Sequence, residues 1–145
     1  MTPLIRAATA SDFDALRALL EAAGLPTADL RVARPAFLVA AAGRELIGAG
    51  ALEIHAETAL LRSLAVAPAW RGRGLGHQVV KALERQARAA GLRQIVLLTE
   101  TAEAFFTRLD YRVIDRAQAP PAVQASREFA ALCPASAVCL AKTLR

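Results

Sequence analysis

The fold is decided by one stretch, Val66-Ala67-Pro68-Ala69-Trp70-Arg71-Gly72-Arg73-Gly74-Leu75-Gly76. It joins an apolar run over residues 58–66, which predicts a buried strand, to a helical pattern that ends near Ala90. Glycines at the start of a helix leave its unpaired N–H groups accessible, and these groups together with the helix dipole attract anions. Arg71 and Arg73 add positive charge at the rim. The stretch therefore predicts a loop that binds a phosphate or pyrophosphate.

This loop differs from two common phosphate-binding motifs. No Gly-Lys-Ser/Thr follows the glycines, so it is not a Walker A loop. The glycines at positions 72, 74 and 76 lack the Gly-x-Gly-x-x-Gly spacing of dinucleotide-binding folds. That fingerprint also follows the first strand of a parallel sheet, whereas this loop follows a predicted antiparallel meander. Glycines that serve only a flexible turn are the alternative interpretation.

The rest of the pattern predicts short strands and helices in one domain over residues 1–145. Strands are expected at residues 4–5, 37–42, 46–54, 58–66, 94–99, 112–114 and 137–144, and helices from residue 11 to 24, from the glycine loop to 90, and from 102 to 109. Short connections make the early strands antiparallel. The strand, loop, helix and strand from 58 to 99 form a right-handed parallel crossover.

Composition excludes several classes of protein. With 145 residues, 55% hydrophobic and 21% charged, the chain is long enough for one core and too apolar for disorder. The net charge of +5 favours an anionic partner, but no basic run or helix-turn-helix signature predicts nucleic-acid binding. No apolar segment is long enough to span a membrane and no signal peptide is evident, so a cytoplasmic protein is expected. Cys133 and Cys139 predict reduced packing residues, and no residue cluster predicts a metal site.

The glycine stretch strongly resembles the acyl-CoA-binding motif of the GNAT acetyltransferase superfamily. That motif, Arg/Gln-x-x-Gly-x-Gly/Ala, is matched by Arg71, Gly74 and Gly76, and the order of elements agrees over essentially the whole chain. The resemblance implies an α/β (α+β) GNAT fold, with helices flanking a mixed, mostly antiparallel sheet of about six or seven strands. It also implies a splay between the fourth and fifth strands, which makes the acyl pocket.

Acetyl-CoA is the co-substrate that the resemblance implies. The loop amides would hold its pyrophosphate, and its pantetheine arm would lie beside the fourth strand. The implied cofactor-binding residues are Leu64, Ala65, Val66, Arg71, Gly72, Arg73, Gly74, Leu75, Gly76, Thr99, Phe105 and Phe106.

A narrower resemblance concerns the acceptor of the acetyl group. It is carried by Gly24-Leu25-Pro26 with Asp29-Leu30, Leu61-Arg62-Ser63-Leu64, Leu97-Leu98-Thr99, Phe105-Phe106, and Glu128-Phe129 with Leu132-Cys133-Pro134. These segments are similar to the arsenic-resistance N-acetyltransferase family, some members of which acetylate arsinothricin, an arsenic-containing amino acid. The resemblance implies a small-molecule amine acceptor and is compatible with a homodimer.

Arginines are the candidates for binding an anionic acceptor. Arg62 lies in the apolar fourth strand, and Arg31 and Arg34 lie in the irregular region after the first helix. A guanidinium can grip a carboxylate or a similar oxyanion with two parallel hydrogen bonds. Arg62 has the alternative of pairing with Glu53 across the hairpin.

The sequence identifies the groups that transfer protons less clearly than it identifies the cofactor loop. Phe106 occupies the position where many GNAT enzymes have the tyrosine that protonates the thiolate, and the only tyrosine, Tyr111, is expected to be a packing residue. Ser63 or water is then the candidate acid, or the thiolate leaves without one. Glu53 is the candidate base, with His55 an alternative by residue type. A backbone N–H near Val66 would polarise the thioester carbonyl.

Several functions are compatible with these patterns. The main hypothesis is transfer of an acetyl group to the amine of a small molecule. Other acceptors are a polyamine, an antibiotic amine or a protein N-terminus. Because Phe106 replaces the usual tyrosine, a non-catalytic acyl-CoA-binding sensor is the alternative from another class.

Overall fold

Seven strands form one mixed sheet in a computed structural model that describes residues 2–144, except for the side chain of Val32. The strands are β1 (Leu4–Ala7), β2 (Ala36–Ala42), β3 (Glu45–His55), β4 (Thr58–Val66), β5 (Gln94–Thr99), β6 (Arg112–Ile114) and β7 (Val138–Thr143). The α-helices are α1 (Phe13–Ala22), α2 (Leu30–Ala33), α3 (Leu75–Ala89), α4 (Glu103–Thr107) and α5 (Pro121–Gln124). A π-helical turn covers Glu128–Leu132. No α-helix in residues 2–144 is long and apolar enough to cross a membrane.

The sheet has the order β1-β2-β3-β4-β5-β7-β6. All neighbouring strands are antiparallel except β4 and β5, which are parallel and joined by α3. This arrangement confirms the predicted meander, the parallel crossover and the GNAT fold.

Strands β4 and β5 stay together over only part of their length. Thr58, Ala59 and Leu60 pair with Gln94, Ile95 and Val96, and no further pair joins the two strands. The second half of β4 therefore has no strand partner on its β5 side. This separation is the splay that the resemblance implied.

A bulge in β4 lies at the start of this separation. The register between β3 and β4 shifts between Ala49 and Ala51, so that β4 carries an extra residue after Arg62. Ser63 there has a left-handed φ of 59°, a conformation that costs a non-glycine residue free energy. Because a bulge bends its strand and increases the local twist, it turns the end of β4 away from β5.

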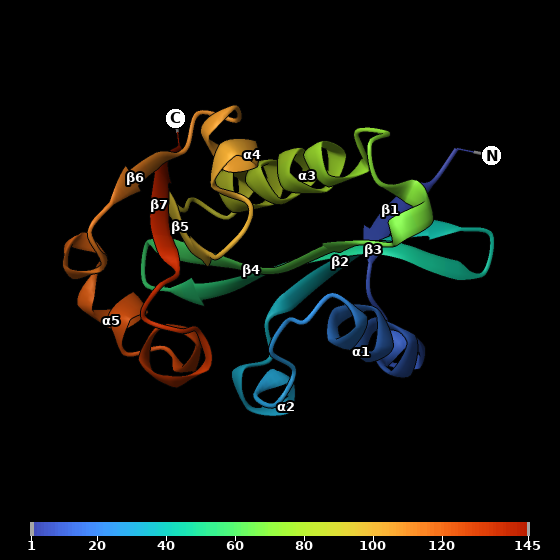
Figure 1. Cartoon of the computed structure of the whole chain (residues 1–145), viewed down its shortest axis with the longest axis horizontal. Coiled ribbons are helices and arrows are strands. Elements are labelled where there is room, and N and C mark those ends of the chain that lie inside the picture. Colours follow the sequence, from blue (N-terminus) through green and yellow to red (C-terminus); the bar gives the residue numbers. More distant parts are fainter. Residues whose placement is uncertain (1, 145) are drawn as a thin grey trace.

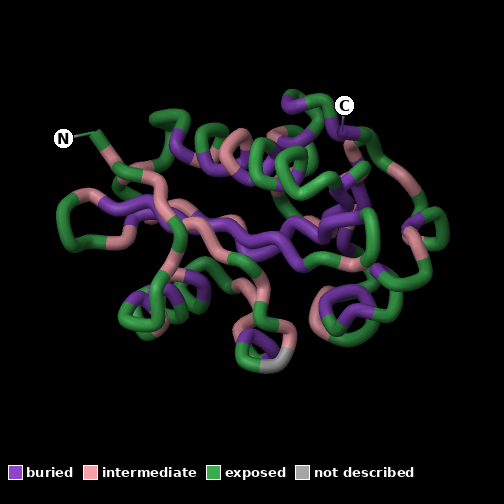
Figure 2. Tube along the Cα trace, turned by 180° about the vertical axis from the view of Figure 1, so that it is seen from behind, coloured by how far each residue is buried: buried purple, intermediate pink, exposed green. Residues whose placement is uncertain are grey.

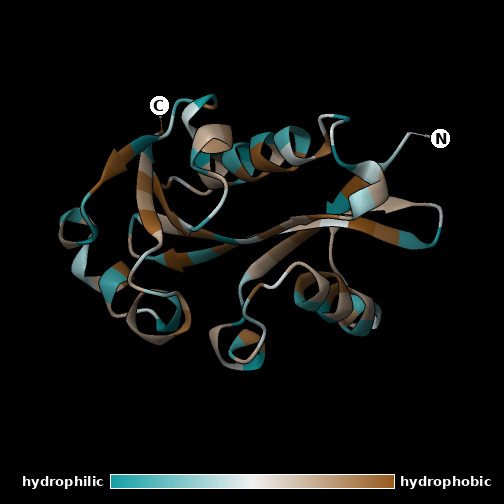
Figure 3. Cartoon of the chain, in the orientation of Figure 1, coloured by the Kyte–Doolittle hydropathy of each residue, from teal (hydrophilic) through white to brown (hydrophobic). Residues whose placement is uncertain are grey.

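Helices cover both faces of the sheet (Figure 1). Helices α3 and α4 lie on one face, and α1, α2 and α5 lie on the other. Helix α3 is amphipathic, as its alternating hydropathy shows (Figure 3), and its buried face includes Val79 and Leu83. Gly50 of β3 lets this helix approach closely, because a Cβ there would lie 2.9 Å from atoms of both side chains.

The buried residues follow the central strands. Most of β3, β4 and β5 is buried between the helical layers (Figure 2). One apolar cluster contains Val79, Leu83 and Phe106 on the α3 side, and another contains Leu16 and Leu20 of α1. The rigid sheet thus fixes the two features that form the site, namely the loop after β4 and the splayed end of β4 itself.

Candidate active site

The loop before α3 presents free hydrogen-bond donors. Gly74 is the residue that precedes the helix and has a left-handed φ of 79°. Within residues 2–144, the backbone N–H groups of Gly72 to Gly76 have no hydrogen-bond partner. A Cβ added at Gly72 or Gly74 would meet no atom within 4 Å, so the surface of the loop is open. These donors at the positive end of α3 fit the pyrophosphate of CoA.

The two loop arginines have different contacts. Arg71 donates from Nε to the carbonyl oxygen of Val66 at 3.1 Å, which fastens the loop to the end of β4. The guanidinium of Arg73 stacks over the ring of Trp70 at 4.8 Å. Both side chains are exposed. Their charge therefore lies beside the free N–H donors.

A cavity of about 220 Å³ opens where β4 and β5 separate. We call it the splay cavity. Its walls come from the loop after α1, the second half of β4, the end of β5 with the loop before α4, and the C-terminal segment. The lining residues are Ala23, Leu25, Pro26, Leu61, Arg62, Ser63, Leu64, Leu97, Leu98, Thr99, Glu100, Thr101, Ala102, Phe106, Glu128, Leu132, Cys133, Pro134 and Ala137.

Three of the expected cofactor residues line this cavity, namely Leu64, Thr99 and Phe106. The hydroxyl of Thr99 accepts a hydrogen bond from the N–H of Ala102 at 3.0 Å and so helps to start α4. Phe106 packs edge-on against Phe105, with ring centroids 5.0 Å apart. The tyrosine position of the motif thus holds a buried ring without a proton to give.

Arg62 is the centre of a buried ion-pair cluster. Its side chain is fully buried, and two of its nitrogens donate to the two carboxylate oxygens of Asp29 at 2.6 and 2.7 Å. Nη1 also donates to Glu53 at 3.1 Å, and Nε donates to the Ser63 hydroxyl at 3.2 Å. Arg62 thus forms the ion pair with Glu53 that was the alternative to substrate binding, and it has Asp29 as an additional partner at shorter distances. Each guanidinium nitrogen already has a protein acceptor, which disfavours a second role in gripping a substrate anion.

Glu128 completes this cluster and faces the splay cavity. Its side chain is 5% exposed, and Oε1 lies 3.8 Å from Nε of Arg62. Oε2 is buried and has no hydrogen-bond partner in the part of the chain described. Burial raises the pKa of Glu128 to about 7, since it disfavours the charged carboxylate. The attraction of Arg62 opposes this rise, and the negative charges of Glu53 and Asp29 add to it.

Sequence reasoning did not single out Glu128 as a functional group. Glu128 lies in an irregular segment after Pro120-Pro121, where no periodicity predicts a buried side chain. The only signal was its place in the Glu128-Phe129 pair of the narrower resemblance.

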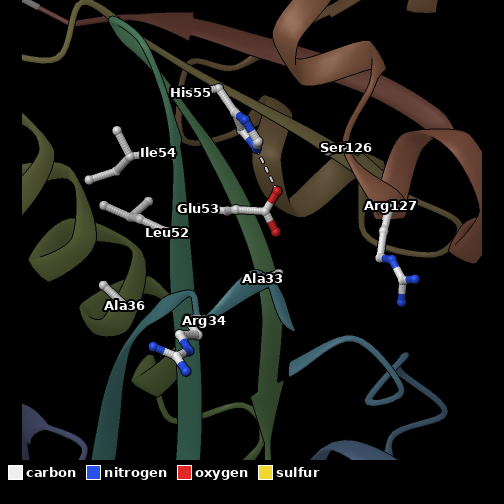
Figure 4. A pocket seen from close by; sticks show the side chains of 9 residues that line it. All are labelled: Ala33, Arg34, Ala36, Leu52, Glu53, Ile54, His55, Ser126 and Arg127. Carbon is white, nitrogen blue, oxygen red and sulfur yellow. Dashed lines mark hydrogen bonds and ion pairs between the residues drawn. The ribbon is translucent and has the colours of Figure 1, made fainter. Parts of the chain in front are cut away.

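Glu53 faces a second hollow of about 440 Å³, between the end of β3, α2 and the segment at Ser126 (Figure 4). Its Oε2 is hydrogen bonded to Nε2 of His55 at 2.5 Å, and the two side chains point toward each other. Arg34 lines the same hollow, whereas the guanidinium of Arg31 stacks over Phe13 at 4.6 Å. The three expected acceptor arginines, including Arg62, are therefore not brought together.

Tyr111 lies outside both hollows. It is 2% exposed, and its hydroxyl donates to the buried carboxylate of Glu84 at 2.9 Å. Lys142 also binds that carboxylate, at 3.1 Å. Burial raises the pKa of Tyr111 well above its ordinary value. These contacts agree with the interpretation of Tyr111 as a packing residue.

A comparison with known protein families identifies the domain that has this geometry. A model described as an acetyltransferase (GNAT) domain matches residues 33–113, which is more than half of the chain. The chain belongs to the GNAT acetyltransferase family. The matched residues of this GNAT domain run from α2 to β6 and contain the glycine loop and the splayed strands.

Solved structures share the fold of this GNAT domain at low sequence identity. N-acetylglutamate synthase from Neisseria gonorrhoeae, complexed with coenzyme A and N-acetyl-glutamate, has a TM-score of 0.85 and 19% identity, covering 100% of this chain and 36% of its own. A Mycobacterium tuberculosis protein in complex with CoA has a TM-score of 0.82 and 24% identity, covering 99% of this chain and 100% of its own. A GNAT-family acetyltransferase from Staphylococcus aureus has a TM-score of 0.83 and 13% identity, covering 99% and 100%.

The present chain spans about a third of the length of the Neisseria synthase. Among curated proteins, none matches this sequence significantly. The family and the fold of the domain are thus established, and the acceptor has to be argued from the site.

Proposed function

We propose that this GNAT domain transfers the acetyl group of acetyl-CoA to the amine of a small molecule. The observation that carries the proposal is the position of two features on one strand. The loop with free N–H donors follows β4, and the splay cavity begins on the same strand at Leu61. An acetyl-CoA molecule whose pyrophosphate is bound at the loop can therefore extend along β4 and bring its thioester into the cavity.

The chain supplies binding and orientation for this reaction. Gly72 to Gly76 would hold the pyrophosphate, and the unpaired edge of β4 around Leu64 to Val66 would bind the pantetheine arm. Acetyl-CoA supplies the activated acetyl group when bound. N–H groups of this β4 edge are the donors available to stabilise charge on the carbonyl oxygen. Holding both reactants in one cavity provides rate by orientation.

The departing thiolate has few proton donors nearby. Phe106 has none, and the Tyr111 hydroxyl is committed to Glu84 in the core. Ser63 lines the cavity with a hydroxyl that accepts a hydrogen bond from Arg62, so its own proton is free to be donated. Ser63 or water is thus the proton source in this proposal.

The acceptor is proposed as a small primary amine. The Neisseria synthase, which shares the fold, was solved with N-acetyl-glutamate, so an amino acid belongs among the acceptors to be tested. The narrower resemblance adds arsinothricin as a specific amino-acid acceptor.

Release of free CoA thiol tests the proposal against the sensor alternative. Purified protein would be incubated with acetyl-CoA and, separately, with propylamine, spermidine, glutamate, phosphinothricin and arsinothricin. Acceptor-dependent thiol release and a product heavier by one acetyl group are expected for at least one amine. Tight acetyl-CoA binding in calorimetry with no thiol release for any amine would instead indicate a sensor.

A further inference from the structure

Glu128 owes its position to the π-helical turn at Glu128–Leu132. The N–H of Cys133 donates to the carbonyl of Glu128 at 3.0 Å, which is the wide π-type bond, and Ser126 caps the start of the turn through the N–H of Phe129 at 3.4 Å. Such turns are rare and occur often at functional sites. Here the turn holds the Glu128 side chain against the splayed strands, where it lines the splay cavity.

The Glu128 carboxylate is the unsatisfied member of its cluster. Among the described residues, Arg62 from β4 is the only cation whose charge acts on this carboxylate, and its nitrogens already bind Asp29, Glu53 and Ser63. Asp29, before α2, and Glu53 of β3 add negative charge, and Cys133 lies on the same turn with a thiol pKa raised to about 11 by burial. A buried oxygen without a donor costs free energy. A ligand that brings N–H donors and positive charge removes this cost.

We propose that Glu128 binds the ammonium group of the acceptor and is the general base of the transfer. This inference rests on the proposed acetyl transfer and specifies its acceptor, which enters the cavity as a small cationic primary amine. The available volume of about 220 Å³ and the apolar walls formed by Leu25, Pro26 and Leu132 suit a short aliphatic amine.

The protons and bonds balance as follows. Oε2 of Glu128 takes one proton from the ammonium, and the neutral nitrogen forms a bond to the acetyl carbonyl carbon. The carbon–sulfur bond then breaks, and the thiolate takes the second proton that the nitrogen must lose, through Ser63 or water. Glu128 returns its proton to solvent. The products are the acetylamide, CoA thiol and one released proton.

Glu53 is less suited to this role than Glu128. Its Oε1 accepts from Arg62 and its Oε2 is bound to His55, so neither oxygen is free. It also lines the hollow at the end of β3 instead of the splay cavity. The pKa of Glu128 near 7 supports the assignment, because a base works best when its pKa lies near the working pH.

The test compares two acceptors that differ in their need for a base. Propylamine is protonated at pH 7 and hydroxylamine is mostly neutral. The isosteric variant Glu128→Gln is expected to lower kcat with propylamine by about 100-fold, the usual contribution of a general base. Transfer to hydroxylamine, after subtraction of the uncatalysed reaction, should change by much less. The wild-type kcat/KM for propylamine should show an inflection at an apparent pKa near 7, and this inflection should be absent from the variant.

Two further variants keep the test decisive. Glu45→Gln makes the same change at an exposed position in the β2–β3 hairpin and should behave as wild type. Should Glu128→Gln fail to fold, Glu128→Asp keeps the carboxylate but withdraws it by one methylene, and it should retain the pH dependence with lower kcat. Acetyl-CoA affinity in calorimetry should be unchanged in every folded variant.

The outcomes separate this inference from the function on which it rests. An equal loss with both amines would show a structural role for Glu128 and overturn the inference. Unchanged transfer to propylamine in Glu128→Gln would also overturn it. Absence of thiol release from the wild-type protein with both amines, and with the wider set above, would instead overturn the proposed acetyl transfer.

Discussion

The Arg62 guanidinium and the Asp29 carboxylate form a two-bond ion pair in which both side chains are fully buried, with N···O distances of 2.6 and 2.7 Å. The pair joins β4 at its bulge to the segment before α2, thirty-three positions earlier in the sequence. A buried charge that loses its partner is strongly destabilising. This contact therefore holds the wall of the splay cavity in place.

Arg62→Lys should destabilise the protein by about 3 kcal/mol. A lysine ammonium lacks the planar fork, so it cannot bind both oxygens of Asp29 and also reach Glu53. Urea unfolding measures the change. Arg17→Lys in the exposed Arg17–Glu21 pair serves as the control and should cost less than about 0.5 kcal/mol. A stable Arg62→Lys protein with a selectively raised acceptor KM would instead assign Arg62 to substrate binding.

Gly74→Val should weaken acetyl-CoA binding at least tenfold. Gly74 and Gly91 have similar left-handed φ angles of 79° and 77°, at opposite ends of α3, and both have open space where a Cβ would lie. Gly91→Val therefore imposes a comparable backbone strain without touching the N–H donors. Calorimetry with acetyl-CoA separates the two effects. Equal affinities in the two variants would argue against the placement of the pyrophosphate at this loop.

Tyr111→Phe should lower stability more clearly than activity. The buried Glu84 would lose the hydroxyl donor at 2.9 Å but keep Lys142, which predicts a loss of about 1–2 kcal/mol. Turnover should fall by much less than the roughly 100-fold expected for loss of a general acid. Thermal unfolding and steady-state rates at one temperature check both expectations. A 100-fold slower enzyme with unchanged stability would identify Tyr111 as the proton donor.

Deprotonation of Glu128 should lower the free energy of unfolding as the pH rises from about 4.5 to about 7. Its pKa is higher in the folded state than in the unfolded state, so the folded protein binds more protons in this range. Its stabilising contribution is complete below the unfolded pKa and is lost as the pH passes the folded pKa.

The difference in unfolding free energy between wild type and Glu128→Gln isolates this contribution, because other titrating groups cancel. Between pH 4.5 and pH 8, the unfolding free energy of Glu128→Gln should increase by about 3 kcal/mol relative to that of wild type. Urea unfolding at a series of pH values gives this difference directly. A pH-independent difference would mean that the Glu128 carboxyl titrates normally.

The sequence alone determined the elements and most of their order. Alternating and continuous apolar runs predicted strands whose bounds lie close to those of β2, β3, β4 and β5. Short connections fixed the antiparallel meander, and the glycine loop before a helical pattern fixed the parallel crossover. These features depend on contacts between residues close in sequence, so local patterns carry them.

Only the tertiary structure decided the partners of the charged residues. The sequence left two roles open for Arg62, and its main partner, Asp29, comes from a loop with no periodicity. Glu128 reaches the same cluster from the far end of the chain, on a π-helical turn that no pattern predicts. Ion pairs and unpartnered polar atoms arise where distant segments pack together. The sequence by itself therefore determined the fold and the glycine loop, whereas chain packing decided which carboxylate faces the splay cavity.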